Sequence, residues 1–198
     1  DSSTEEISTF DQKIDWLIDW LAEHKDEKVL LICQTRELVE QIYEAVQKHV
    51  NLNLSQFHEG LNLIQRDRQA AYFADPKGAR VLLCSEIGSE GRNFQFVHHL
   101  ILWDLPENSE LVEQRIGRLD RIGQSGTVNV HVPLIEQSAE VVRFRWLHEG
   151  LNAFESSCSI GHLVFSELGD ALRVCESSGE LSDALLKDTQ QLRVQLIS

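Results

Sequence analysis

The chain has 198 residues, of which 42% are hydrophobic and 25% charged, and its formal net charge is −14. These proportions are typical of a folded globular domain and exclude a disordered or fibrous chain. They also argue against a self-sufficient nucleic-acid binder, because neutralising phosphates needs an excess of lysine and arginine. Any nucleic-acid surface must therefore be local, or shared with another part of a larger protein.

The cysteines and the apolar runs further limit the kind of protein that the sequence can encode. The four cysteines show neither C-x-x-C pairing nor zinc-ligand spacing, so no metal site is expected. Cys33 and Cys84 lie inside apolar runs, and we expect both to be buried in a reducing cytoplasm. No apolar run approaches the length of a membrane span, and no signal peptide opens the chain. The absence of methionine favours a piece of a longer protein.

The hydrophobic pattern predicts alternating helices and strands up to about residue 154. Strands that are apolar on both faces and alternate with helices indicate a parallel sheet covered by helices on both sides. Helices are predicted at residues 11–24, 36–49, 62–75, from Asn108 or Ser109 onward and at 138–154, and strands at 29–33, 54–59, 80–85, 98–104 and 127–135. We therefore expect an α/β domain with a parallel sheet of about five strands.

The end of the chain differs from this pattern. Residues 156–198 contain no clear strand and one predicted helix, at 180–196. We expect a main domain at residues 1–155 and, at 156–198, a helical extension or the start of a neighbouring domain.

Polar residues follow several of the predicted strands. In an open parallel sheet, ligands bind beyond the carboxyl ends of the strands. The loop from Gly88 to Gly91 has two glycines three residues apart, which would let a phosphate or ribose approach the backbone, although an ordinary strand-to-helix turn is the alternative. No Gly-x-x-x-x-Gly-Lys-Ser/Thr motif occurs in the chain, so this segment cannot hydrolyse a nucleoside triphosphate by itself in the P-loop manner.

The segment 113–124, "EQRIGRLDRIGQ", places Arg115, Arg118 and Arg121 three residues apart. On a predicted helix these arginines would lie close together, and their repulsion would be relieved by a bound anion. Gly117 weakens such a helix by roughly 1 kcal/mol relative to alanine. A glycine between arginines suits the close approach of a phosphate, but solvated surface arginines are the alternative.

These residues resemble a known family. The stretch at 114–121, "QRIGRLDR", resembles motif VI of superfamily 2 helicases, and the "IGQ" that follows is similar to its Swi2/Snf2 branch. Residues 84–94, "CSEIGSEGRNF", resemble motif V, and residues 29–37, "VLLICQTRE", resemble motif IV. The resemblance covers about residues 11–155 and implies the second RecA-like lobe of such a motor. The bacterial RNA-polymerase-associated members are the most similar.

The resemblance implies three sets of site residues. Two arginine fingers would reach the γ-phosphate of ATP, a second set would contact the nucleotide, and a third would lie near the duplex backbone. The sets are Arg118 and Arg121; Gln114, Glu90 and Gly91; and Thr35, Arg36 and Ser85. The turn at His58–Gly60 also resembles a family turn, and either a structural role or a place near nucleic acid fits it.

The implied function is half of an ATP-driven motor that translocates on double-stranded DNA and recycles RNA polymerase in the bacterial cytoplasm, at the nucleoid. ATP with Mg²⁺ would be bound mainly by a first lobe in the same chain, and the fragment alone would be inactive. Two alternatives stay open. One is the second lobe of a strand-separating superfamily 2 helicase, and the other is a degenerate lobe that only binds a protein partner through its acidic surface.

Overall fold

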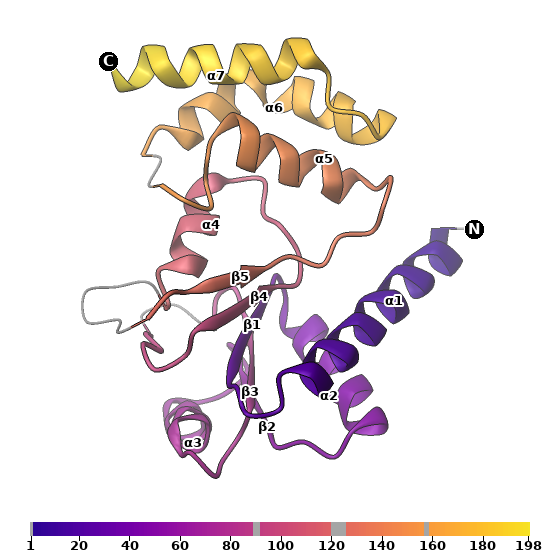
Figure 1. The fold of residues 1–198 in the computed structure, drawn as a ribbon, viewed down its shortest axis with the longest axis vertical. Helices are drawn as coiled ribbons and strands as arrows, with labels where there is room; N and C mark the ends of the chain where they lie inside the picture. Colours follow the sequence, from indigo (N-terminus) through magenta and orange to yellow (C-terminus); the bar gives the residue numbers. More distant parts are fainter. Residues whose placement is uncertain (1, 89–91, 120–125, 157–158) are drawn as a thin grey trace. The chain divides into compact units, whose positions relative to one another are not determined.

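The computed structural model of the protein describes residues 2–88, 92–119, 126–156 and 159–198, with side chains from residue 9 onward (Figure 1). The chain forms two compact units. Unit 1 comprises residues 1–104 and 118–133, and unit 2 comprises residues 105–117 and 134–198. No helix in the described part of the chain is both long enough and apolar enough to cross a bilayer.

Unit 1 is built on a parallel sheet whose order is β2-β3-β1-β4-β5. The strands are β1 (Val29–Cys33), β2 (Leu54–Phe57), β3 (Val81–Ser85), β4 (His99–Leu102) and β5 (Asn129–His131). All five predicted strands are confirmed, but β5 has only three of the nine residues predicted for it. It is an edge strand, and Pro133 just beyond it has no N–H with which to extend the ladder.

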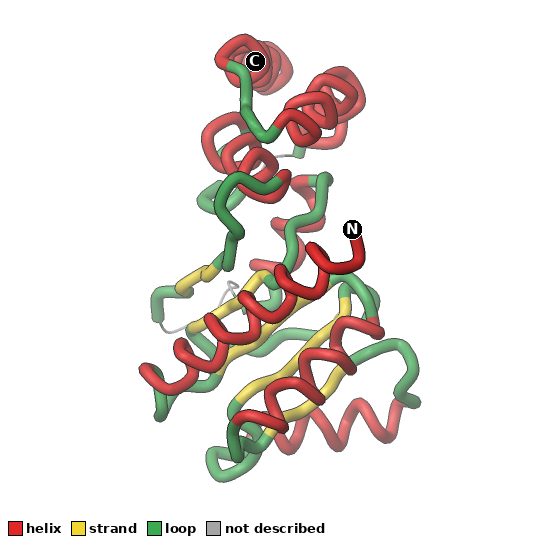
Figure 2. Tube along the Cα trace, turned by 90° about the vertical axis from the view of Figure 1, so that its right-hand side faces the viewer, coloured by secondary structure: helices red, strands yellow, loops and turns green. Residues whose placement is uncertain are grey.

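Helices cover both faces of the sheet. The helices α1 (Ser2–Glu23) and α2 (Arg36–His49) lie over one face, and α3 (Leu63–Ala74) lies on the other (Figure 2). The predicted starts of α2 and α3 are confirmed by their caps, whereas α1 begins at Ser2, well before the predicted residue 11. The hydroxyl of Thr35 accepts from the backbone N–H of Leu38 at 3.2 Å, and Asn62 forms a capping box with Gln65.

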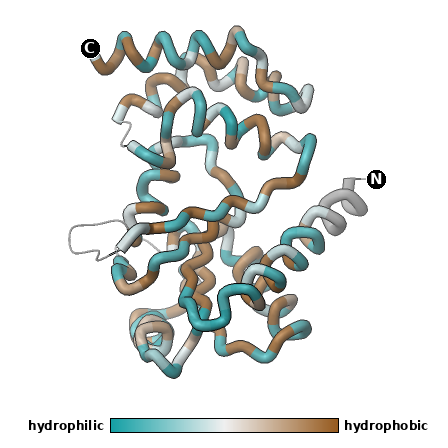
Figure 3. The backbone as a smooth tube through the Cα atoms, viewed as in Figure 1, coloured by the Kyte–Doolittle hydropathy of each residue, from teal (hydrophilic) through white to brown (hydrophobic). Residues whose placement is uncertain are grey.

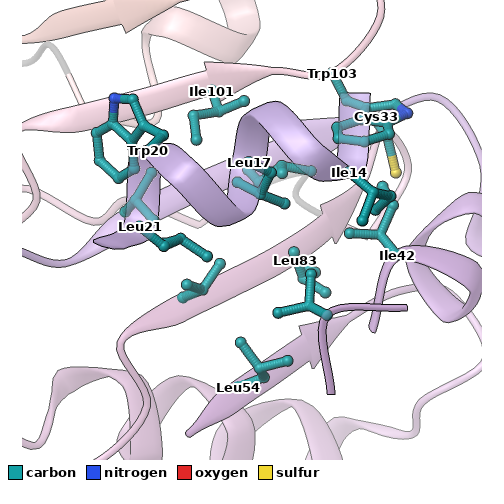
Figure 4. Packing of buried hydrophobic residues seen from close by; sticks show 14 of the residues in the cluster. Ile14, Leu17, Trp20, Leu21, Cys33, Ile42, Leu54, Leu83, Ile101 and Trp103 are labelled. Atoms are coloured by element: carbon teal, nitrogen blue, oxygen red, sulfur yellow. The ribbon is translucent and has the colours of Figure 1, made fainter. Parts of the chain in front are cut away.

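One hydrophobic cluster joins α1 and α2 to the sheet (Figure 4). Its members come from one face of each helix and from alternate positions along the strands. They include Ile14, Leu17, Trp20, Leu21, Cys33, Ile42, Leu54, Leu83, Ile101 and Trp103. The inner strands β1, β3 and β4 are largely hydrophobic, as the brown runs of Figure 3 show. Cys33 and Cys84 are fully buried, as predicted, and burial raises the pKa of the Cys84 thiol well above its ordinary value.

Aromatic rings hold the short edge strand to its neighbours. The ring nitrogens of His99 on β4 and His131 on β5 are 3.0 Å apart, and Trp20 of α1 contacts both rings. The carboxylate of Glu27 pairs with the other ring nitrogen of His99. Burial lowers the pKa values of both histidines, so the cluster favours their neutral forms.

Unit 2 is helical. It contains α4 (Ser109–Ile116), α5 (Ala139–Arg145), a π-helical turn η1 (Trp146–Gly150), α6 (Gly161–Ser178) and α7 (Asp183–Ile197). The helices predicted at 138–154 and 180–196 are confirmed, the first as α5 continued by η1. The sequence pattern did not predict α6.

Partly buried and fully buried polar contacts tie these helices together. The guanidinium of Arg143 on α5 donates twice to the carboxylate of Glu176 on α6, at 3.0 Å each, and once to the carbonyl of Leu105 at 2.7 Å. The indole N–H of Trp146 donates to the hydroxyl of Thr189 on α7 at 2.9 Å. Both partners in this second contact are fully buried, so neither can exchange it for water.

We predict that Thr189→Val lowers the free energy of unfolding by about 1–3 kcal/mol, because it leaves the buried indole N–H without an acceptor at nearly constant volume. Urea unfolding of the 198-residue chain measures the change. Thr127 is exposed, so Thr127→Val is the matched control and should change stability by less than about 0.5 kcal/mol. Equal effects of the two substitutions would contradict the assigned role of Thr189.

Candidate functional site

The strand register brings three loops together at the carboxyl edge of the sheet. Cys33 of β1 is level with Ser85 of β3, and Phe57 of β2 is level with Cys84. The residues that follow these positions therefore leave the sheet at nearly the same height. These are residues 34–36, 58–60 and 86–88. They lie at the edge of the sheet where the sequence predicted that polar residues bind a ligand.

The loops after β2 and β3 are joined by a buried hydroxyl. Ser85 is 1% exposed, and its Oγ donates to Oε2 of Glu59 at 2.6 Å. The same oxygen accepts from the backbone N–H of Gly88 at 3.0 Å. This contact fixes the start of the glycine-bearing loop to the turn that follows β2.

The loops after β1 and β2 meet at a glycine. The guanidinium of Arg36 lies against Gly60 so closely that a Cβ there would overlap it. Arg36 Nε also donates to Glu40 at 3.0 Å. The N–H of Gly60 donates to Nδ1 of buried His58 at 3.1 Å, which completes the turn. Arg36 and Ser85, which were predicted to lie near the duplex backbone, therefore both contact the turn at residues 58–60.

The electrostatics of this turn favour a charged Glu59 and a neutral His58. The hydrogen bond from Ser85 lowers the pKa of Glu59, and the charge of Arg36 acts in the same direction. Burial lowers the pKa of His58, and the charge of Arg36 lowers it further. At neutral pH the turn therefore carries one carboxylate beside one guanidinium.

Thr35 and its neighbour Gln34 both form hydrogen bonds that hold the loop after β1. Thr35 is half-buried, and its hydroxyl oxygen caps α2. The N–H of Gln34 donates to Oδ2 of Asp104, two residues beyond the end of β4, at 2.9 Å. This bond ties the loop after β1 to the end of β4.

The prediction that Arg115, Arg118 and Arg121 share one helix is wrong for the described residues. The helix α4 ends at Ile116, and the N–H of Gly117 makes its last bond, to Glu113, at 2.9 Å. The carbonyl of Arg118 instead accepts from the N–H of Phe94 at 2.7 Å. This tertiary bond holds the segment just beyond α4, which follows a glycine that weakens the helix.

The structure gives different environments to the motif VI side chains that it describes. Gln114 is exposed at the end of α4, whereas Arg115 is 1% exposed. Arg118 is 8% exposed and close enough to Cys84 to oppose the rise in the pKa of that thiol. It therefore lies near the carboxyl end of β3.

Three predicted site residues, Glu90, Gly91 and Arg121, lie outside the described residues. Among the residues that are described, no group of His, Cys, Asp and Glu side chains is arranged to hold a metal ion. The structure adds Glu59, which the sequence analysis placed only in a turn of open role. Its partner Ser85 is 26 residues away in the sequence, so residue spacing gave no signal of this contact.

Comparison with protein families gives two adjacent matches. Residues 12–123 match the family described as helicase conserved C-terminal domain, and residues 127–198 match the family described as RNA polymerase recycling family C-terminal. The chain is 48% identical over 190 residues to the RNA polymerase-associated protein RapA of Pseudomonas putida (strain GB-1). That match covers 94% of the chain and 20% of the relative. The chain thus spans about a fifth of the length of the curated relatives it matches.

Solved structures give the same fold. The C-terminal part of the Fun30 ATPase domain matches with a TM-score of 0.62 and 21% identity, over 82% of this chain and 52% of that one. The C-terminal domain of the DEAD-box protein Dbp5 matches with a TM-score of 0.60 and 18% identity, over 72% of this chain and 80% of that one. These similarities confirm the expected RecA-like fold of a helicase C-terminal lobe.

We predict that Gly88→Ala destabilises the protein by more than about 2 kcal/mol, because the added Cβ would meet backbone that cannot yield easily. It would lie 2.5 Å from His58 Cα and 2.6 Å from the carbonyl oxygen of Phe57. Gly60→Ala is the matched control and should cost less than about 1 kcal/mol, because it meets only the flexible Arg36 side chain. Urea unfolding of both variants checks this, and equal losses would refute the close packing of the loops.

We predict that Ser85→Ala raises the pKa of Glu59 toward its ordinary value, because the hydrogen bond that lowers it is lost. A titration of the Glu59 carboxyl carbon by NMR measures the shift. Glu44 pairs with Lys48 on α2 and does not contact Ser85, so the chemical shift of its carboxyl carbon at neutral pH is the internal control. An unaltered Glu59 titration would mean that Ser85 does not govern this carboxylate.

The same substitution should change how stability depends on pH. Because the folded-state pKa of Glu59 is lowered, its stabilising contribution is present above the unfolded-state pKa and is lost as pH falls through the folded-state pKa. In Ser85→Ala the two pKa values approach each other. The fall in unfolding free energy below about pH 5 should then be shallower than in the wild type.

Proposed function

The chain belongs to the helicase conserved C-terminal domain family, and from that membership we propose that it forms the second motor lobe of an ATP-driven DNA translocase that remodels and recycles RNA polymerase. The observation that carries this proposal is the pair of adjacent family matches, helicase C-terminal domain and then RNA polymerase recycling family C-terminal. A relative at 48% identity is named for its association with RNA polymerase. The two together favour a polymerase-directed motor over a general helicase.

In this proposal, ATP hydrolysis belongs to the longer protein. ATP with Mg²⁺ supplies the free energy of translocation and is bound mainly by a first lobe of the same protein. A buried guanidinium near the carboxyl end of β3, that of Arg118, suits a group that must meet negative charge in a site shielded from water. Arg118 and Arg121 act as the arginine fingers, and Gln114, Glu90 and Gly91 contact the nucleotide. The 198-residue chain alone is then inactive as an ATPase.

The duplex backbone is contacted at the carboxyl edge of the sheet. We assign this contact to Thr35, Arg36 and Ser85, of which Arg36 is exposed and Ser85 is held beneath Glu59. Hydroxyl and backbone N–H donors can position phosphates without a large positive charge. This is how a chain with a net charge of −14 can line part of a DNA path.

The remaining assignments follow from the same proposal. Residues 1–155 form the motor lobe, and residues 156–198 form an extension or the start of the next domain. The protein acts in the bacterial cytoplasm at the nucleoid, with RNA polymerase, double-stranded DNA and its own first lobe as partners.

We predict that Arg121→Ala in the full-length protein lowers kcat for DNA-stimulated ATP turnover about 10³- to 10⁵-fold while ATP still binds, because an arginine finger acts on the transition state. Arg118→Ala should have the same effect. Turnover is measured by phosphate release and ATP binding by a fluorescent nucleotide. Arg145 is exposed and pairs with Glu149 on the next turn, so Arg145→Ala is the control and should retain wild-type turnover.

Other outcomes would select the alternative functions. Unaltered turnover after loss of both Arg118 and Arg121 would favour a degenerate lobe that only binds a partner. Robust unwinding of a duplex by the wild-type protein would favour a strand-separating helicase.

A further inference from the structure

Glu59 lies on the exposed turn that follows β2, yet its carboxylate holds a buried hydroxyl. Its Oε2 accepts a hydrogen bond of 2.6 Å from Ser85 Oγ, and Ser85 is 1% exposed. The Gly88 N–H donates to the same Ser85 oxygen at 3.0 Å. Because a hydroxyl has a single proton to donate, the donor of Ser85 is committed to Glu59.

In this contact Glu59 takes the place that a bound anion would take on the Ser85 hydroxyl. A carboxylate and a phosphodiester both present negatively charged oxygens, which take short, charge-assisted hydrogen bonds from hydroxyl groups. The guanidinium of Arg36 lies against Gly60, the next residue in the chain, and its charge reaches Glu59. Glu59 is therefore an internal anion held by the hydroxyl and beside the guanidinium that the proposed function assigns to the duplex backbone.

We propose that Glu59 is an internal competitor of the nucleic-acid backbone, which occupies the Ser85 hydroxyl until a phosphate displaces it. This inference rests on the proposed function, in which Ser85 and Arg36 contact the duplex. A phosphate can receive the Ser85 proton only after Glu59 turns outward. Because Glu59 is exposed, its carboxylate is readily solvated when it leaves, and the exchange needs no change in the sheet.

A purely structural role for Glu59 makes the opposite prediction. If Glu59 only braced residues 85–88, removing its charge would loosen that segment, and more DNA would be needed to stimulate the motor. If Glu59 competes with phosphate, removing its charge weakens the hydrogen bond that engages the Ser85 donor and removes a repulsion, and less DNA is needed. The direction of the change separates the two roles.

The test measures ATP turnover of the full-length protein against the concentration of a blunt duplex DNA at low salt. Glu59→Gln keeps an acceptor for Ser85 but removes the charge, and Glu59→Ala removes both. We expect the half-saturating DNA concentration to fall about 3- to 10-fold in both variants, the size expected for loss of one charge-assisted bond to a competing anion. The thermal unfolding midpoint of Glu59→Gln confirms that the variant is folded.

The matched control removes a carboxylate that does not contact Ser85. Glu44 on α2 pairs with Lys48 at 3.2 Å, and Glu44→Gln should shift the half-saturating concentration less than about 2-fold. In a Ser85→Ala background, the effect of Glu59→Gln should shrink, because the contested donor is gone.

Two negative outcomes have different meanings. If DNA stimulates the wild-type protein but Glu59→Gln leaves the half-saturating concentration unchanged or raises it, the competitor role is overturned and the motor function stands. If DNA does not stimulate the wild-type protein at all, the proposed function is overturned, and the role of Glu59 is overturned with it.

Discussion

The fixed register among β1, β3 and β2 is the constraint on which the candidate site depends. These strands are buried on both faces and run parallel, so a slip of one residue would exchange the side chains packed against α1 and α2 for those packed on the opposite face. The hydrophobic core therefore sets the height at which each strand ends. As a result, loops that are far apart in the sequence meet at one edge of the sheet.

The loops that leave the sheet at this common height then touch each other, through glycines that allow close approach and through hydrogen bonds. The loops after β2 and β3 approach so closely that Gly88 has no room for a side chain, and Gly60 leaves space for a guanidinium. Ser85 donates to Glu59 across the two loops, and Gly60 donates to His58 within the turn after β2. Loops are usually the more mobile part of a domain. Here hydrogen bonds hold the described parts of these loops, residues 58–60 and 86–88, to each other.

The sequence was most informative where a pattern is local. Apolar runs such as residues 29–33 identify buried strands, and caps such as Thr35 mark helix starts, because each signal lies within a few residues. The helix α6 was missed because it begins at a glycine, Gly161, and Gly169 interrupts its apolar spacing. In the structure Gly161 abuts Ser109 of α4, a contact that local propensity does not reveal. The Glu59 contact is likewise set by a partner far away in the sequence.

On the proposed function, the acidic residues behind the net charge of −14 weaken DNA binding, because some of them pair with surface arginines. Arg36 at the carboxyl edge pairs with Glu40, and Arg92 pairs with Asp67. A phosphate that approaches either guanidinium meets a carboxylate already in place, so each contact exchanges one anion for another. Such exchanges contribute little net free energy on the surface. On the proposed function, the lobe is then a weak binder by itself, and firm attachment to DNA depends on the partner lobe.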